Sequence, residues 1–188
     1  MTKRDVVLYP EGRAILRKHC APVRRVDSRA KSLVQDLVDT LNAHGDGIGL
    51  AAPQIGANHR IVVVCLGGGP GSHQDPGPPL PLINPRIVEA SDELPDFDGC
   101  LSFPGLYGVT TRPHHVRVVG LGPSGRAFDR VFEGFDAVVV HHELDHLDGV
   151  LFIDRVARLE DLYRVRQGED GRMVRLPVSS LTDIARNG

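Results

Sequence analysis

The spacing of apolar residues predicts two long helices and one weaker helix. Between Ser28 and His44 the apolar positions repeat every three or four residues, Asp27 or Ser28 can cap the start, and Gly45 ends the pattern. Ala137–Leu147 reads as a second helix, apolar first and polar afterwards. Leu159–Gln167 shows a weaker helical pattern. A turn at Tyr9–Gly12 leads into a short helix.

β-branched runs between these helices predict strands. Ile61–Leu66 is typical of a buried strand, and Leu82–Pro85 of a strand that its proline keeps near a sheet edge. Val116–Leu121 and Ala127–Phe135 flank a Gly-Pro-Ser-Gly turn, which indicates a hairpin. Residues 67–81 are rich in glycine and proline and read as an exposed loop. This order of helices and strands predicts an α+β fold.

Composition narrows the class of protein. The 188 residues suit one domain, which we place at residues 1–168, followed by a loose polar tail at 169–188. A hydrophobic fraction of 41% and a charged fraction of 24% are typical of a soluble globular protein, and a net charge of −2 gives no sign of a DNA-binding surface. No apolar run is long enough for a membrane span or a signal peptide. Three widely spaced cysteines do not form a disulfide framework, so we expect a reducing cytoplasm.

The strongest chemical signal is His142-Glu143-Leu144-Asp145-His146. Residues four apart share one face of a helix, so His142 and His146 can hold one metal ion. Glu143 then lies close enough to take a proton from a water molecule that the ion acidifies. A polar helix could carry two histidines by chance, but the preceding Ala137–Val140 run marks this helix as a buried element.

A catalytic metal site of this kind needs a third protein ligand and an open position. Downstream of His146 there is no histidine, and Glu160 and Glu169 lack a supporting pattern. Upstream, Cys100 follows Gly99, which allows close backbone approach, so its thiolate is the preferred third ligand. Cys20 and Cys65 read as packing residues. Ligand types alone would favour zinc.

Three segments resemble the motifs of the peptide deformylase family, in the family's order. They are Gly47–Gln54 (GIGLAAPQ, against GxGxAAxQ), Gly99–Ser102 (GCLS, against EGCxS) and His142–Gly149 (HELDHLDG, against QHExDHxxG). The resemblance extends over roughly residues 5–165. It implies antiparallel sheets packed around a central helix that carries the HExxH motif, in a deformylase-like catalytic domain.

The resemblance also implies an activity and residue roles. The enzyme would remove the formyl group from N-formyl-methionyl peptides and release formate, with transient contact with the ribosome. Cys100, His142 and His146 would hold one divalent ion, Fe(II) in the family, with zinc, nickel or cobalt as substitutes. The Gln54 side chain and the Leu101 N–H would hold the formyl oxygen, and Glu143 would act as the general base. Read alone, Gln54 is a surface residue after a turn.

Side chains just before the metal-binding motif predict a pocket for methionine. Val138 and Val139 precede His142 by four and three positions and so share its face of the helix. With Phe135 and Ile48 they would wall an apolar slot. The small residues Gly49 and Gly99 would let the substrate backbone lie close.

Two positions depart from the family pattern. Asp98 replaces the usual glutamate and can still pair with a cation, for which Arg112 is the candidate. His141 replaces the usual glutamine and should point away from the ligands. These departures leave open a deformylase-like paralogue that acts on another N-formyl amide, or a non-catalytic paralogue that binds formyl peptides. An HExxH endopeptidase is disfavoured because a downstream ligand is missing.

Overall fold

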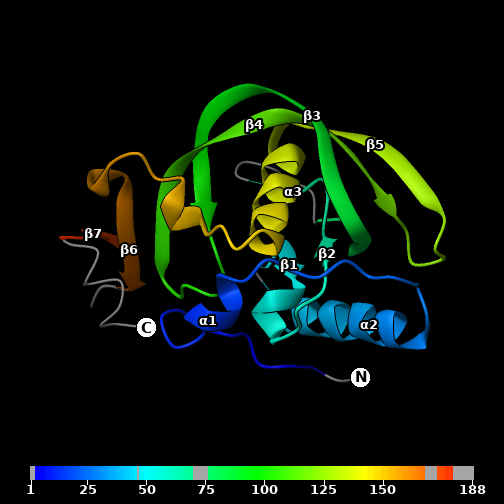
Figure 1. Ribbon diagram of the computed structural model, residues 1–188. Coiled ribbons are helices and arrows are strands. Elements are labelled where there is room, and N and C mark those ends of the chain that lie inside the picture. The colour runs from blue at the N-terminus through cyan, green and yellow to red at the C-terminus, as the bar shows by residue number, and fades with distance from the viewer. Residues whose placement is uncertain (1–2, 46, 70–75, 168–172, 180–188) are drawn as a thin grey trace.

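The computed structural model describes residues 3–45, 47–69, 76–167 and 173–179. A strongly curled antiparallel sheet wraps around one helix, and a second long helix lies outside it (Figure 1). The helices are α1 (Arg13–Leu16), α2 (Ser28–Asn42) and α3 (Gly134–Leu147), with short 3-10 turns at Ala52–Ile55, Phe152–Asp154 and Leu159–Asp161. The strands are β1 (Gly49–Ala51), β2 (Ile61–Val64), β3 (Leu80–Gly99), β4 (Leu106–Leu121), β5 (Ala127–Glu133), β6 (Leu162–Gln167) and β7 (Met173–Pro177). The predicted α+β class is confirmed.

The strands form one sheet in the order β1-β2-β3-β4-β6-β7, with β5 paired to β4. The start of β3 pairs with β2, and the rest of β3 pairs with β4 as far as Gly99. The β2 partners of β3 end at Ile83, so the pairing agrees with the prediction that the proline of Leu82–Pro85 lies near a sheet edge. Pro85 is tolerated there because the register with β4 also shifts between Ile83 and Arg86, so its missing N–H falls at an irregularity.

Helix α2 matches its prediction except that it ends at Asn42 rather than His44. The Asp27 carboxylate accepts hydrogen bonds from the Arg29 and Ala30 N–H groups and caps the helix. Its apolar face, which includes Leu33, Leu37 and Leu41, packs on buried residues of β1 and β2. This packing anchors the segment that leads into β1.

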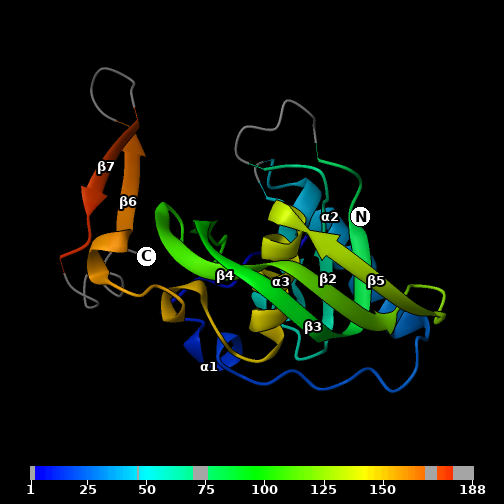
Figure 2. The same ribbon diagram turned by 90° about the horizontal axis from the view of Figure 1, so that it is seen from above.

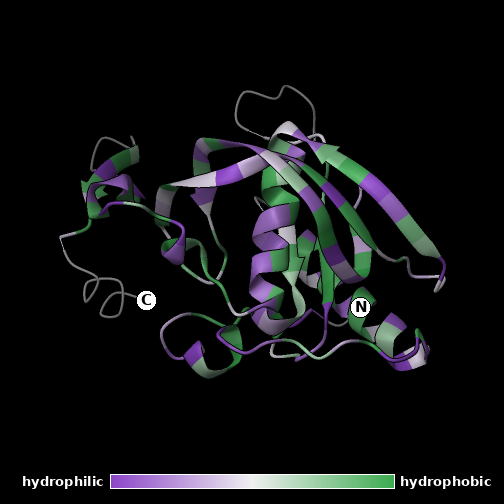
Figure 3. Cartoon of the chain, turned by 45° about the horizontal axis from the view of Figure 1, so that its top comes forward, coloured by the Kyte–Doolittle hydropathy of each residue, from purple (hydrophilic) through white to green (hydrophobic). Residues whose placement is uncertain are grey.

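Helix α3 begins at Gly134, three residues before the predicted start, where a positive φ of 56° suits glycine. Its first half is hydrophobic and its second half hydrophilic (Figure 3). Both halves are largely buried, and the helix packs against β1, β2, β4 and β5. The polar residues of its second half therefore lie inside the molecule.

The C-terminal part differs from the sequence-based expectation. The helix predicted over Leu159–Gln167 is wrong, because β6 pairs with β4 through Leu106–Gly108 and with β7 on its other side. Met173–Pro177, inside the predicted polar tail, forms β7, and residues 168–172 and 180–188 lie outside the described residues. The predicted loop at 67–81 ends earlier, since β3 begins at Leu80; its residues 70–75 are not described.

The thiols behave as the sequence suggests. All three cysteines are free, and Cys20 and Cys65 are buried within apolar clusters, as predicted. In the described ranges, none of the helices has both the length and the hydrophobicity that a membrane crossing requires.

Candidate metal centre

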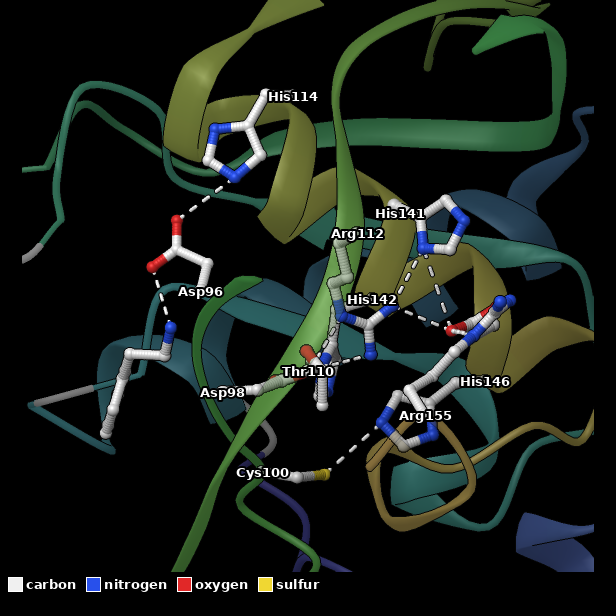
Figure 4. A network of polar contacts seen from close by, with 12 residues as sticks. Asp96, Asp98, Cys100, Thr110, Arg112, His114, His141, His142, His146 and Arg155 are labelled. Atoms are coloured by element: carbon white, nitrogen blue, oxygen red, sulfur yellow. Dashed lines mark hydrogen bonds and ion pairs between the residues drawn. The ribbon is translucent and has the colours of Figure 1, made fainter. Parts of the chain in front are cut away.

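The structure brings Cys100, His142 and His146 together. One ligand atom from each lies within 4.8 Å of the others. The two histidines are one turn apart on α3, and Cys100 directly follows the last residue of β3 (Figure 4). The Cys100 Sγ lies 3.3 Å from His146 Nε2. The side chains that were predicted from spacing therefore share one small volume.

A buried carboxylate orients His142. Asp98 Oδ1 lies 2.7 Å from His142 Nδ1, which leaves Nε2 for a ligand. Asp98 Oδ2 accepts hydrogen bonds from Arg112 Nε at 2.7 Å and from the Thr110 hydroxyl at 2.9 Å. Burial alone would raise the pKa of Asp98, but His142 and Arg112 outweigh it and hold that pKa well below its usual range. Asp98 is thus a stable anion beside the histidine.

Arg112 is fully buried and joins two carboxylates. Besides Asp98 it donates to Asp145 Oδ2 at 2.8 Å, and Arg155 binds the same carboxylate from the surface side. The predicted pairing of Asp98 with Arg112 is confirmed. Sequence reasoning missed Thr110, Asp145 and Arg155, although an acid inside the HELDH motif was a signal for Asp145.

His141 points away from the three ligand atoms, as expected. Its Nδ1 lies 2.7 Å from Arg112 Nη1 and 3.7 Å from Asp145 Oδ2. Burial lowers the pKa of His141 to about 4, and the nearby cations act in the same direction. A neutral imidazole there can accept the Arg112 hydrogen bond.

Glu143 lies between the histidines and is buried. Burial raises its pKa to about 7, although His142 and Arg112 favour the charged form. Its Oε2 finds no hydrogen-bond partner among the described residues. Its other carboxylate oxygen lies against Gly49, where a Cβ atom would come within 2.3 Å of Oε1. An unpaired carboxylate held this tightly is suited to exchange a proton with a molecule in the site.

Gln54 is also buried rather than on the surface. Its Oε1 accepts from the Ala51 N–H at 2.8 Å, and its amide nitrogen lies 3.4 Å from Cys100 Sγ and 3.3 Å from Ser102 Oγ. In the described part of the chain, the Leu101 N–H forms no backbone hydrogen bond. Both groups therefore bring N–H donors to the neighbourhood of Cys100.

A cavity of about 600 Å³ lies beside these groups and is lined by Gln54, Cys100, Leu101, His142 and Glu143. All the residues predicted to bind substrate line it: Ile48, Gly49, Gly99, Phe135, Val138 and Val139. The N-terminal segment, including Asp5, Val6 and Leu8, also lines it, as do Phe97 and Tyr107. Nothing in their sequence pattern marked these as cavity residues. Phe97 and Tyr107 reach the site through the pairing of β3 with β4, and the N-terminal segment through the Val7 N–H bond to the Gln54 carbonyl.

The donor set suits a divalent transition metal. One sulfur and two imidazole nitrogens are ligands typical of zinc and iron sites. The amide of Gln54 donates toward the Cys100 sulfur. Within the described residues the cluster contains three protein ligands, which leaves room for a further ligand in a four-coordinate site. The residues present can therefore hold such an ion.

Comparisons with known proteins agree with this geometry. A family model described as polypeptide deformylase matches residues 3–161. The peptide deformylase of Thermomicrobium roseum is 45% identical over 149 residues, which are 79% of this chain and 84% of that protein. The crystal structure of peptide deformylase from Thermotoga maritima superposes with a TM-score of 0.74 at 33% identity, over 84% of this chain and all of that one. The Ehrlichia chaffeensis enzyme, solved in complex with actinonin, gives a TM-score of 0.75 at 32% identity, over 84% and 91% of the two chains. The chain therefore belongs to the polypeptide deformylase family.

Proposed function

We propose that this protein removes the N-formyl group from the N-terminal formylmethionine of nascent peptides, and that it does so at the centre formed by Cys100, His142 and His146. The observation that carries this proposal is the meeting of these three side chains beside the buried Glu143, next to a cavity that Cys100, His142 and Glu143 line. The family supplies the reaction, amide hydrolysis that releases formate.

The ion would be held by the Cys100 thiolate and the two imidazoles of α3. When bound, a divalent metal supplies Lewis acidity and lowers the pKa of water. Glu143 takes the proton of the attacking water and returns it to the leaving amine, a role for which its raised pKa and unpaired oxygen suit it. Asp98 keeps the His142 ring in the orientation that presents Nε2.

Two hydrogen-bond donors would stabilise the negative charge that develops on the formyl oxygen. The Leu101 N–H and the Gln54 amide both lie beside Cys100. To reach the substrate, Gln54 would turn one N–H away from Ser102 or Cys100. Donors of this kind contribute roughly 3 kcal/mol each to transition-state stabilisation.

The apolar wall would receive the methionine side chain. Ile48, Phe135, Val138 and Val139 line the cavity next to the ligands. Gly49 and Gly99 would let the substrate backbone lie against β1 and the end of β3.

The native metal is part of this proposal. Resemblance to the family favours Fe(II), with zinc, nickel or cobalt as active or partly active substitutes. A mixed thiolate and imidazole site suits all of them. We further propose a cytoplasmic protein that contacts the ribosome transiently, since formylated chains emerge there. Residues 1–168 would form the catalytic domain and 169–188 its C-terminal extension.

The test is formate release from formyl-Met-Ala-Ser by protein purified without oxygen, with its metal quantified. We expect about one metal ion per chain and rapid release. Cys100→Ala should lose both metal and activity, whereas Cys65→Ala, which removes a buried thiol elsewhere, should keep both. Formyl-Met should exceed formyl-Ala in kcat/KM by about tenfold or more. Equal rates on both would point to another N-formyl amide, and binding without release to a non-catalytic paralogue.

A further inference from the structure

A second hollow lies where the β6–β7 hairpin meets the ends of β3 and β4. It measures about 310 Å³ and is lined by Phe97, Tyr107, Tyr163, Val165, Met173 and Arg175, which we call the aromatic ledge. Figure 2 shows β6 and β7 projecting at one end of the molecule. The family match ends at residue 161, so this hairpin lies beyond the matched region.

The ledge is built from stacked rings. The Tyr107 ring stacks on Phe97 with centroids 5.4 Å apart and on Tyr163 with centroids 6.3 Å apart. The Arg175 guanidinium lies over the Tyr163 ring, 4.5 Å from its centroid. Side chains alternate along a strand, so Tyr163 and Val165 share one face of β6, and Arg164 and Arg166 point to the other.

The ledge is continuous with the catalytic cavity. Phe97 and Tyr107 line both hollows. The Tyr107 ring also lies over Gly99, where an added Cβ atom would come within 2.6 Å of it. Gly99 directly precedes the metal ligand Cys100. A chain that leaves the metal centre along this wall therefore meets the stacked rings next.

Exposure and charge indicate what the ledge holds. Phe97 and Met173 are exposed hydrophobic residues, 40% and 67% accessible. Arg175 is the charged residue among the six. Among the described residues no carboxylate forms an ion pair with it. The surface is thus complementary to an extended peptide with apolar contacts and one negative charge.

We propose that the aromatic ledge binds the downstream part of the formylated substrate, and that Arg175 selects chains with an acidic side chain there; this inference rests on the proposed function. The steps from Tyr107 to Tyr163 and on to Arg175 are 6.3 Å and 4.5 Å. An extended peptide rises about 3.3 Å per residue, so about three residues cover them. Tyr107 borders the catalytic cavity, which would hold the first residues of the substrate. The acidic side chain would therefore belong to one of substrate residues four to seven.

The test compares kcat/KM for formyl-Met octapeptides that carry one Glu or one Lys at each position from four to seven. At one of these positions the Glu peptide should exceed the Lys peptide by about two- to fivefold, as for an exposed ion pair. Arg175→Gln should abolish this preference, and Arg175→Glu should reverse it. Arg166→Glu makes the same charge change on the opposite face of the hairpin and should preserve the preference.

Four outcomes would overturn the proposal. Equal rates for the Glu and Lys peptides at every position would leave the ledge without this role and the deformylase function intact. A preference that Arg166→Glu alters as much as Arg175→Glu would reflect net charge. If the Arg175 variants changed only the sedimentation of the protein, the ledge would be a contact with a second copy. No formate from any peptide would overturn the proposed function as well.

Discussion

Among the glycines that line the site, Gly49 leaves the least space for a side chain, because Glu143 lies against it. Adding one methyl group at position 49 tests whether this contact positions the carboxylate. In Gly49→Ala the new Cβ would lie 2.3 Å from Glu143 Oε1 and 2.8 Å from its Cδ and Cγ. Ordinary contacts between such atoms are 3.4–4 Å. The carboxylate must therefore move by about 1 Å, because β1 is paired with β2 and cannot easily withdraw.

A displacement of this size in a catalytic group costs about 100-fold in rate. That corresponds to about 2.7 kcal/mol in the activation barrier. We expect kcat for formyl-Met-Ala-Ser to fall by about this factor, measured as formate release at saturating substrate. The metal content should stay at the wild-type value because the substitution does not touch the ligands.

Gly45→Ala is the matched control. A Cβ atom there meets nothing within 4 Å, so kcat should be unchanged. If Gly49→Ala kept a kcat within twofold of the wild type with normal metal content, the placement of Glu143 against β1 would have no part in catalysis.

Three further predictions concern Arg112, Asn84 and the metal ion. Arg112→Met removes the buried cation that joins Asp98 and Asp145, so unfolding should become easier by about 3–5 kcal/mol. The same variant should hold its metal about 10–100-fold more weakly in competition with a chelator, and unchanged affinity would show that Asp98 does not need Arg112. Asn84 bonds to both the N–H and the C=O of Val23 and has a φ of 49°. Asn84→Ala should therefore lose about 3 kcal/mol in denaturant unfolding and Asn84→Gly less; an equal loss would exclude backbone strain. Iron-loaded protein should lose activity in air faster than nickel-loaded protein, and identical decay would mean that iron oxidation is not the weak point.

Local patterns in the sequence were sufficient for the two long helices and for the two histidines proposed as ligands. The apolar repeat of α2 and its Asp27 cap are contained within adjacent residues. His142 and His146 are four positions apart, so the helix alone places them together. Cys100 was harder, because its position beside them depends on where β3 ends.

Features decided by strand pairing could not be read from local pattern. Most of the second half of β3 is exposed and four of its ten residues are acidic, so it lacks the apolar alternation that marks a strand. Its pairing with β4 defines it instead. β6 contains good helix formers, but pairing with β4 and β7 overrides that preference. The contact of Gly49 with Glu143 joins residues distant in sequence and follows only from the packing of α3 on β1.

The most direct test of the central claim is the turnover of Glu143→Ala at saturating formyl-Met-Ala-Ser, with the metal quantified in the same sample. Glu143 is not a ligand in the proposed centre, so the variant should keep close to the wild-type metal content. Loss of the proton-transfer group should lower kcat by about 10²–10⁴-fold. A variant with full metal and an unchanged kcat would contradict the account, because hydrolysis would then proceed without the carboxylate between the two histidines.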